Sequence, residues 1–61
     1  MNLSQKRIRT LINELQDIVD TLSWEDQKTI SFWVLNKYDI TSEEEEALII
    51  MYEKYKGYGT E

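Results

Sequence analysis

The fold of this chain depends most on residues 4–22, which read SQKRIRTLINELQDIVDTL. Apolar residues recur in this stretch at intervals of three and four, as they do along one side of an α-helix. At 100° per residue they occupy an arc of about 120°, and polar residues lie opposite. Ser4 precedes the pattern and is a suitable N-cap. We therefore predict a helix over residues 4–22 whose buried side comprises Ile8, Leu11, Ile12, Leu15, Ile18, Val19 and Leu22.

A second helix is predicted over residues 24–38. Ser23 is a suitable N-cap, and Asp26 follows it three residues later, as in a variant of the capping box. Phe32 and Trp33 lie roughly 90° to 150° around the helix from the centre of its main apolar group. We therefore expect both of these aromatic side chains to point away from the core. The side that we expect to be buried comprises Trp24, Ile30, Val34, Leu35 and Tyr38.

A third helix is predicted over residues 42–56. Either Thr41 or Ser42 can cap it, because Glu44 and Glu45 stand three residues after them. Acidic residues also favour the positive end of the helix dipole, and Gly57 is a suitable C-terminal stop. Residues 58–61 are expected to be a frayed tail. The side that we expect to be buried comprises Ala47, Leu48, Met51, Tyr52 and Tyr55.

These helices predict a single all-α domain over residues 1–61. Pro is absent and Gly occurs only at Gly57 and Gly59, so no linker divides the chain. Short joints favour antiparallel neighbours, and the expected architecture is an up-down-up three-helix bundle. The first and third helices of such a bundle start at the same end. The basic cluster of Lys6, Arg7 and Arg9 is therefore expected to approach the acidic run of Glu43, Glu44, Glu45 and Glu46.

The size of the chain points to association with protein. A domain of 61 residues buries a smaller fraction of its surface than a larger domain does, and its stability is expected to be only about a few kcal/mol. The sequence contains no Cys and no His, so disulfides and the usual zinc ligands are excluded. Oligomerisation, most simply as a dimer, is the remaining common way to complete so small a core.

Composition argues against several other functions. The formal charge of −5 disfavours attraction to nucleic acid or to anionic lipid. Without His, no Ser or Thr has the usual base beside it, so neither catalysis nor a cofactor is expected. An EF-hand loop that started at Asp39 would place Glu44 where Gly is required and Ile50 where a bidentate Glu is required. No signal segment or membrane span is recognisable, and a cytoplasmic location is expected.

DNA binding through a helix-turn-helix is not expected either. The second and third predicted helices could form such a unit, but the third begins with Glu43, Glu44, Glu45 and Glu46, which would repel the DNA backbone.

Apolar residues outside the predicted core indicate a contact surface instead. Phe32 and Trp33 leave the buried side of the second helix, and Ile49 and Ile50 flank that of the third. An exposed patch of this size is typical of a protein interaction site, with Trp33 and Tyr52 as expected anchors. A competing interpretation places Phe32 and Trp33 in an unusually complete core. The favoured prediction is a small adaptor, regulator or inhibitor, of the kind that phages and mobile elements encode, which binds a second copy of itself or a larger protein.

The acidic run supports an alternative function. Glu43, Glu44, Glu45 and Glu46 could imitate the phosphates of DNA and block a basic nucleic-acid-binding protein. Glutamates in the first turn of a helix are also ordinary capping residues, and the basic cluster could neutralise them. The interaction through apolar residues is therefore the first hypothesis, and the acidic decoy is the second.

Overall fold

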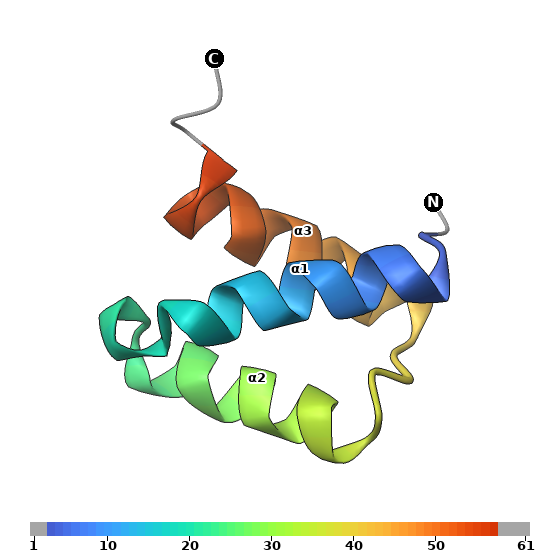
Figure 1. Ribbon diagram of the computed structural model, residues 1–61, viewed down its shortest axis with the longest axis horizontal. Helices are drawn as coiled ribbons and strands as arrows, with labels where there is room; N and C mark the ends of the chain where they lie inside the picture. Colours follow the sequence, from blue (N-terminus) through green and yellow to red (C-terminus); the bar gives the residue numbers. More distant parts are fainter. Residues whose placement is uncertain (1–2, 58–61) are drawn as a thin grey trace.

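The computed structural model describes residues 3–57 and contains three α-helices. They are α1 (Gln5–Asp17), α2 (Trp24–Leu35) and α3 (Ser42–Tyr55), with a short 3-10 helix, η1 (Val19–Thr21), between the first two. The helices run up, down and up (Figure 1), within overall dimensions of 26 × 25 × 17 Å. The predicted all-α three-helix fold is confirmed. The predicted frayed tail, residues 58–61, lies outside the described residues.

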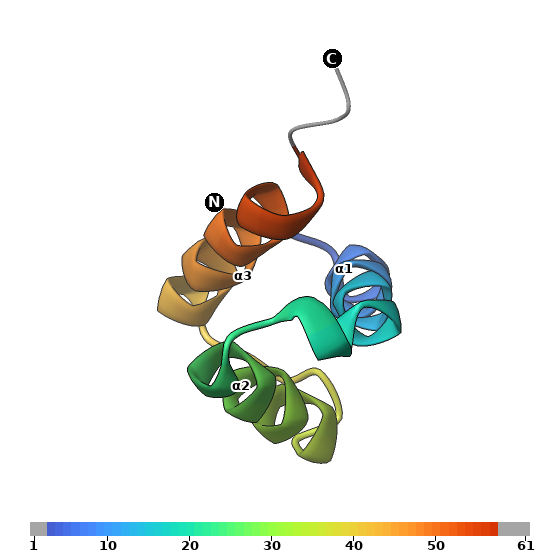
Figure 2. The same cartoon turned by 90° about the vertical axis from the view of Figure 1, so that its left-hand side faces the viewer.

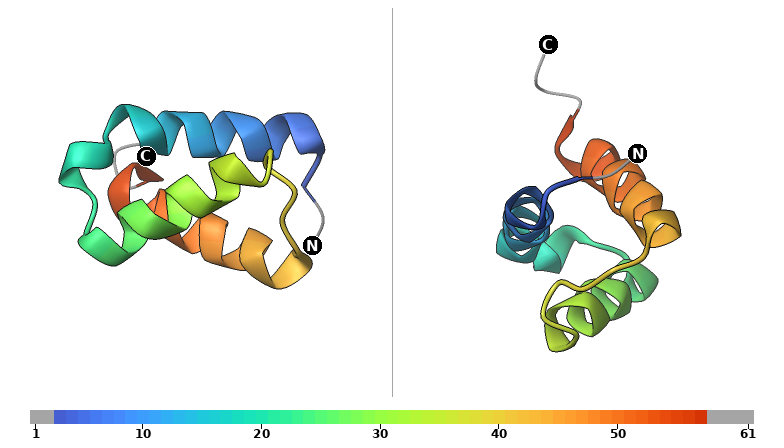
Figure 3. Two further views of the ribbon diagram at one scale, coloured as in Figure 1. Left: turned by 90° about the horizontal axis from the view of Figure 1, so that it is seen from below. Right: turned by 90° about the vertical axis from the view of Figure 1, so that its right-hand side faces the viewer.

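α1 is the central packing element of the fold. It packs against both α2 and α3, whereas few or no backbone contacts join α2 to α3 in the described part of the chain. Figure 2 shows α1 on one side and the pair α2 and α3 on the other. The helices also cross at an angle instead of lying parallel (Figure 3, left). The side of α2 and α3 that faces away from α1 is therefore not covered by a third helix.

α1 buries the side that the sequence predicts. Its buried residues are Ile8, Leu11, Ile12 and Leu15, and Ser4 caps it by accepting a hydrogen bond from the Arg7 backbone N–H at 3.1 Å. The helix ends at Asp17 and not at residue 22 as predicted. Asp17 and Asp20 place negative charges near the negative end of the helix dipole, which is unfavourable for a longer helix. The Thr21 hydroxyl also donates to the Ile18 carbonyl at 2.7 Å, which favours a turn over continued helix. Leu22 still reaches the core, because the turn redirects it there.

α2 buries only part of the side that was predicted. Ile30 is buried as predicted, with 1% of its surface exposed, and Val34 and Tyr38 are partly buried against the core. Trp24 and Leu35 are exposed instead, and Trp33 is buried, with 2% of its surface exposed. The predictions for Trp24, Leu35 and Trp33 were therefore wrong. The inner side of α2 begins with polar residues, since Asp26 and Gln27 are both half-buried. 

These polar residues have partners inside the fold, which explains the orientation of α2. The Gln27 side-chain amide donates to the Leu22 carbonyl at 3.0 Å, and Asp26 accepts a hydrogen bond from the Tyr55 hydroxyl at 2.6 Å. Because both residues face the neighbouring elements, Ile30 and Trp33, one and two turns further along, face the core.

The end of α2 is fixed by two residues with positive φ. Lys37 and Tyr38 have φ values of 60° and 65°, and their backbone N–H groups donate to the carbonyls of Val34 and Trp33. This is a Schellman motif in which a non-glycine residue occupies the left-handed position. The Tyr38 hydroxyl donates to the Asn13 side-chain oxygen at 3.2 Å, and the Arg9 guanidinium lies 5.2 Å from its ring centre. Tyr38 thereby ties the joint before α3 to α1.

α3 begins with a complete capping box. The Thr41 hydroxyl accepts from the Glu44 backbone N–H at 3.1 Å, and the Glu44 carboxylate accepts from the Thr41 N–H at 2.8 Å. Leu48 and Met51 are buried as predicted, but Ala47, predicted to be buried, is exposed. Ala47 lies on the side of α3 that turns toward α2, where the two helices leave space between them.

The predicted pairing of the basic and acidic clusters is not formed. Glu45 is buried and accepts a hydrogen bond from the Leu3 backbone N–H at 3.0 Å, so the start of α1 does lie beside the start of α3. The ion pairs within residues 3–57 are instead Lys54 with Asp26 at 3.6 Å and Lys56 with Glu14 at 3.7 Å. Lys6, Arg7 and Arg9 form no ion pair with a carboxylate within residues 3–57, although the charge of Arg7 contributes to lowering the pKa of Glu14.

Candidate protein-binding surface

The five residues predicted to bind protein occupy three different environments. Phe32 and Ile50 are exposed, with 57% and 65% of their surface accessible. Ile49 and Tyr52 are half-buried. Trp33 belongs to the core, with 2% of its surface exposed. The structure therefore favours Phe32 and Ile50 as candidate contact residues and assigns Trp33 mainly to the fold.

Two further apolar residues are exposed although the sequence pattern predicts that they are buried. Trp24 is 70% exposed and Leu35 is 80% exposed, and both lie on the outer side of α2. Together with Lys28, Ser31 and Phe32 they line a shallow hollow along this helix. Positions 24, 28, 31 and 35 follow one another at spacings of four, three and four, which is the signal of a single helix side. The sequence prediction instead places Trp24 and Leu35 on the buried side of the helix.

Lys28 contributes apolar area to this hollow as well as charge. Its ammonium lies 5.8 Å from the centre of the Trp24 ring, within the range of a cation–π interaction. The side chain therefore extends along the helix toward Trp24, and its methylene stem is available for apolar contact.

A second series of hollows lies between α2 and α3. One is lined by Thr29, Phe32 and Trp33 of α2 and by Ala47 of α3. The next is lined by Thr29 again and by Ala47, Ile50 and Met51. Because the two hollows share Thr29 and Ala47, they form a continuous groove, which we call the α2–α3 groove.

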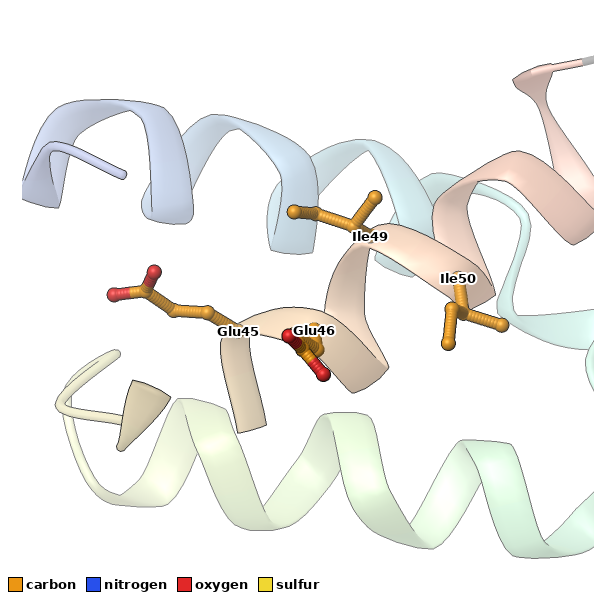
Figure 4. A pocket seen from close by; sticks show the side chains of 4 residues that line it. All are labelled: Glu45, Glu46, Ile49 and Ile50. Carbon is orange, nitrogen blue, oxygen red and sulfur yellow. The ribbon is translucent and has the colours of Figure 1, made fainter. Parts of the chain in front are cut away.

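A further hollow opens on the outer side of α3. Figure 4 shows it with its four lining residues, Glu45, Glu46, Ile49 and Ile50. Ile50 lines both this hollow and the α2–α3 groove, and Phe32 lines both the groove and the hollow on α2. The exposed apolar residues are therefore joined into one surface. We call this surface the apolar strip and define it by Trp24, Phe32, Leu35, Ala47 and Ile50.

The glutamate run is divided between the fold and the surface. Glu44 belongs to the capping box, and Glu45 is buried against the backbone of Leu3. Glu43 and Glu46 are exposed. The candidate acidic surface of the sequence is thus reduced to two freely exposed carboxylates and the half-buried Glu44, all beside the apolar strip.

Two hydrogen-bonded carboxylates fasten the helices behind this surface. The Tyr55 hydroxyl donates to Asp26 and accepts from the Ser23 backbone N–H at 3.1 Å. The hydrogen bond from Tyr55 lowers the pKa of the Asp26 carboxyl, and the contributions of Ser23 and Lys54 act in the same direction. These contacts hold the end of α3 against the start of α2.

The second carboxylate joins α3 to α1. The Tyr52 hydroxyl donates to Glu14 at 2.6 Å, which lowers the pKa of the Glu14 carboxyl and raises the pKa of Tyr52. The hydroxyl of Tyr52, predicted to be an interaction anchor, therefore has a partner inside the fold.

Residues 3–57 contain neither a group of metal-ligand side chains nor a helix that could span a membrane. No group of three Asp or Glu side chains is placed to hold a metal ion. None of the described helices is long and apolar enough to cross a bilayer. What the candidate surface provides is apolar contact area with charged residues at its edges.

Comparison with known proteins adds no further assignment. Neither a model of a known protein family, nor a curated protein, nor a solved structure matches this chain. The function must therefore be inferred from the surface itself.

Proposed function

We propose that this protein is a small interaction module that binds protein through the apolar strip. The observation that carries the proposal is the exposure of four large apolar side chains on one joined surface, namely Trp24, Phe32, Leu35 and Ile50. A small soluble domain rarely exposes a contiguous apolar patch unless the patch is functional. Such a patch, rimmed by charged residues, is typical of protein interaction sites.

The strip is large enough to support specific binding. Burying a large apolar side chain contributes about 1.5 to 3 kcal/mol, so four of them contribute on the order of 6 to 12 kcal/mol before the cost of association is deducted. Micromolar affinity requires about 8 kcal/mol net, which only the upper end of this range reaches once the cost of association is deducted, so contacts at the rim must supply the remainder. Trp24 replaces Trp33 as the expected aromatic anchor.

The acidic decoy has less support than the apolar interface. Glu44 and Glu45 serve the cap and the core, so imitation of a phosphate row would depend on Glu43 and Glu46. Phosphates of double-stranded DNA are spaced regularly along a long backbone, and two exposed carboxylates in one helical turn reproduce little of that charge.

The proposal can be tested by site-specific photo-cross-linking in the cells that make the protein. A photoreactive amino acid at position 35, in the strip, is compared with the same amino acid at Gln16, which is exposed on α1. We expect a discrete cross-linked protein from position 35, absent from position 16 and reduced when Phe32→Ser is added. Cross-links of equal yield from both positions, or none from position 35, would contradict the proposal. The mass of the product separates a second copy from another protein.

A further inference from the structure

The α2–α3 groove has the length of a binding site for a short helix. It is lined by apolar and small side chains from two helices: Thr29, Phe32, Trp33, Ala47, Ile50 and Met51. Along α3 it extends from Glu44 to Lys54, which are ten positions apart and therefore separated by on the order of 15 Å at 1.5 Å per residue. About three turns of an added helix fit this length and would place apolar residues into the groove at intervals of three and four.

The two ends of the groove differ in charge. At the end formed by the start of α2, Asp26 and Lys54 neutralise each other at 3.6 Å. At the opposite end Glu44 lines the groove, and the exposed Glu43 and Glu46 belong to the same turns of α3. Among the residues that line this end, Lys28 of α2 is the one base. Its ammonium lies over the Trp24 ring. The rim is therefore acidic at one end and neutral at the other.

We infer that the α2–α3 groove binds a basic amphipathic helix of another protein. The inference rests on the proposed function and specifies its partner: apolar residues of that helix occupy the groove, and its Lys or Arg residues lie beside Glu43, Glu44 and Glu46. Complementary charge of this kind increases the rate of association and fixes the direction in which a helix docks. A second copy of the chain fits less well, because each copy carries a formal charge of −5 and would bring the same carboxylates to the interface.

The inference can be tested with two synthetic amphipathic helices of about 18 residues. Both peptides have the same leucine face, and they differ only in carrying Lys or Glu beside it. Binding of each labelled peptide to the full chain is measured by fluorescence anisotropy at low and at high salt. We expect the Lys peptide to bind at least about tenfold more tightly than the Glu peptide at low salt, and the difference to shrink at high salt.

Substitutions in the groove locate the binding. Ile50→Ser should weaken binding of the Lys peptide by about tenfold or more, whereas Leu35→Ser, on the strip but outside the groove, should change it less than about twofold. The double substitution Glu43→Gln with Glu46→Gln should weaken it about three- to tenfold. Asp17→Asn with Asp20→Asn removes the same charge from exposed positions away from the groove and should leave binding nearly unchanged. Circular dichroism verifies that each variant remains folded.

The possible results distinguish the inference from the proposed function. Equal binding of both peptides, loss of binding with Leu35→Ser but not with Ile50→Ser, or no binding of either peptide would overturn the inference. Self-association that is weakened by Ile50→Ser would also overturn it, because the groove would then accept a second copy. In each of these cases a discrete cross-link from position 35 would still support the proposed function. If that cross-link is absent but the Lys peptide binds in the groove, the proposed function is contradicted and the preference of the groove for a basic helix is not.

Discussion

The two sides of α2 carry similar amounts of apolar surface but have opposite environments. The inner side presents Ile30 and Trp33, which are at most 2% exposed, and the outer side presents Trp24 and Leu35, which are at least 70% exposed. Apolar character alone therefore does not determine which side is buried. Polar contacts distinguish the inner side, because Asp26 accepts a hydrogen bond from Tyr55 of α3 and Gln27 donates to the Leu22 carbonyl just before α2. The inner side stabilises the fold, and the outer side remains available for a partner.

The largest expected difference between the two sides of α2 is the loss of stability when either of two adjacent aromatic residues, Phe32 and Trp33, is replaced. Trp33→Ala should destabilise the fold by about 3 to 5 kcal/mol, because it leaves a large cavity in the core. Since a domain of this size has only about a few kcal/mol of stability, the variant should be largely unfolded at 25 °C by circular dichroism. Phe32→Ala, one residue earlier, should cost less than about 1 kcal/mol, because its side chain is 57% exposed. Equal losses in urea unfolding of the two variants would show that both aromatic residues belong to the core.

The sequence predicts α1 better than α2 for a physical reason. Along α1 the apolar residues Ile8, Leu11 and Leu15 all face the core, so periodicity alone identifies the buried side. Along α2 the buried side begins with Asp26 and Gln27, and its pattern becomes visible only when these polar residues are counted as inward-facing. Their bonding partners come from outside α2 and were not foreseeable from the pattern.

The candidate site was predicted in part for the same reason. Phe32 and Ile50 were correctly expected at the surface, because they lie away from the buried side of their helices whichever apolar group is chosen. Trp24 and Leu35 were not predicted at the surface, because they share one apolar group with Ile30, Val34 and Tyr38, which do lie in or against the core. The groove between α2 and α3 depends on the crossing of the helices, which periodicity does not report.

A smaller effect is expected at the polar contact that orients α2. The hydrogen bond from Tyr55 lowers the pKa of the Asp26 carboxyl in the folded chain. Its contribution is therefore complete above the unfolded pKa of Asp, about 3.9, and is lost as the pH falls through the lower folded pKa. Because the group is partly accessible to water, we expect about 1 kcal/mol or less.

Urea unfolding between about pH 6 and pH 2 measures this contribution. The wild-type free energy of unfolding should decrease below about pH 4, and Asp26→Asn should be less stable at pH 6 and show a smaller decrease. Asp17→Asn, at an exposed position without this bond, is the matched control and should retain the wild-type decrease. Identical pH profiles for wild type and Asp26→Asn would show that this contact does not orient α2.

The smallest effect is expected on the outer side, and its dependence on concentration is informative. Leu35→Gln exchanges two residues of similar helix propensity at a position that is 80% exposed, so the free energy of unfolding should change by no more than about 0.5 kcal/mol. A larger loss in dilute solution would mean that Leu35 is covered within one chain, contrary to the structure. A loss that appears only at high protein concentration would mean that two copies cover it, because association stabilises the folded state by mass action. No loss at either concentration would mean that the outer side of α2 is uncovered in the isolated protein. Leu35, Trp24 and Phe32 would then contribute nothing to folding at this side. Only a different protein could bury these side chains.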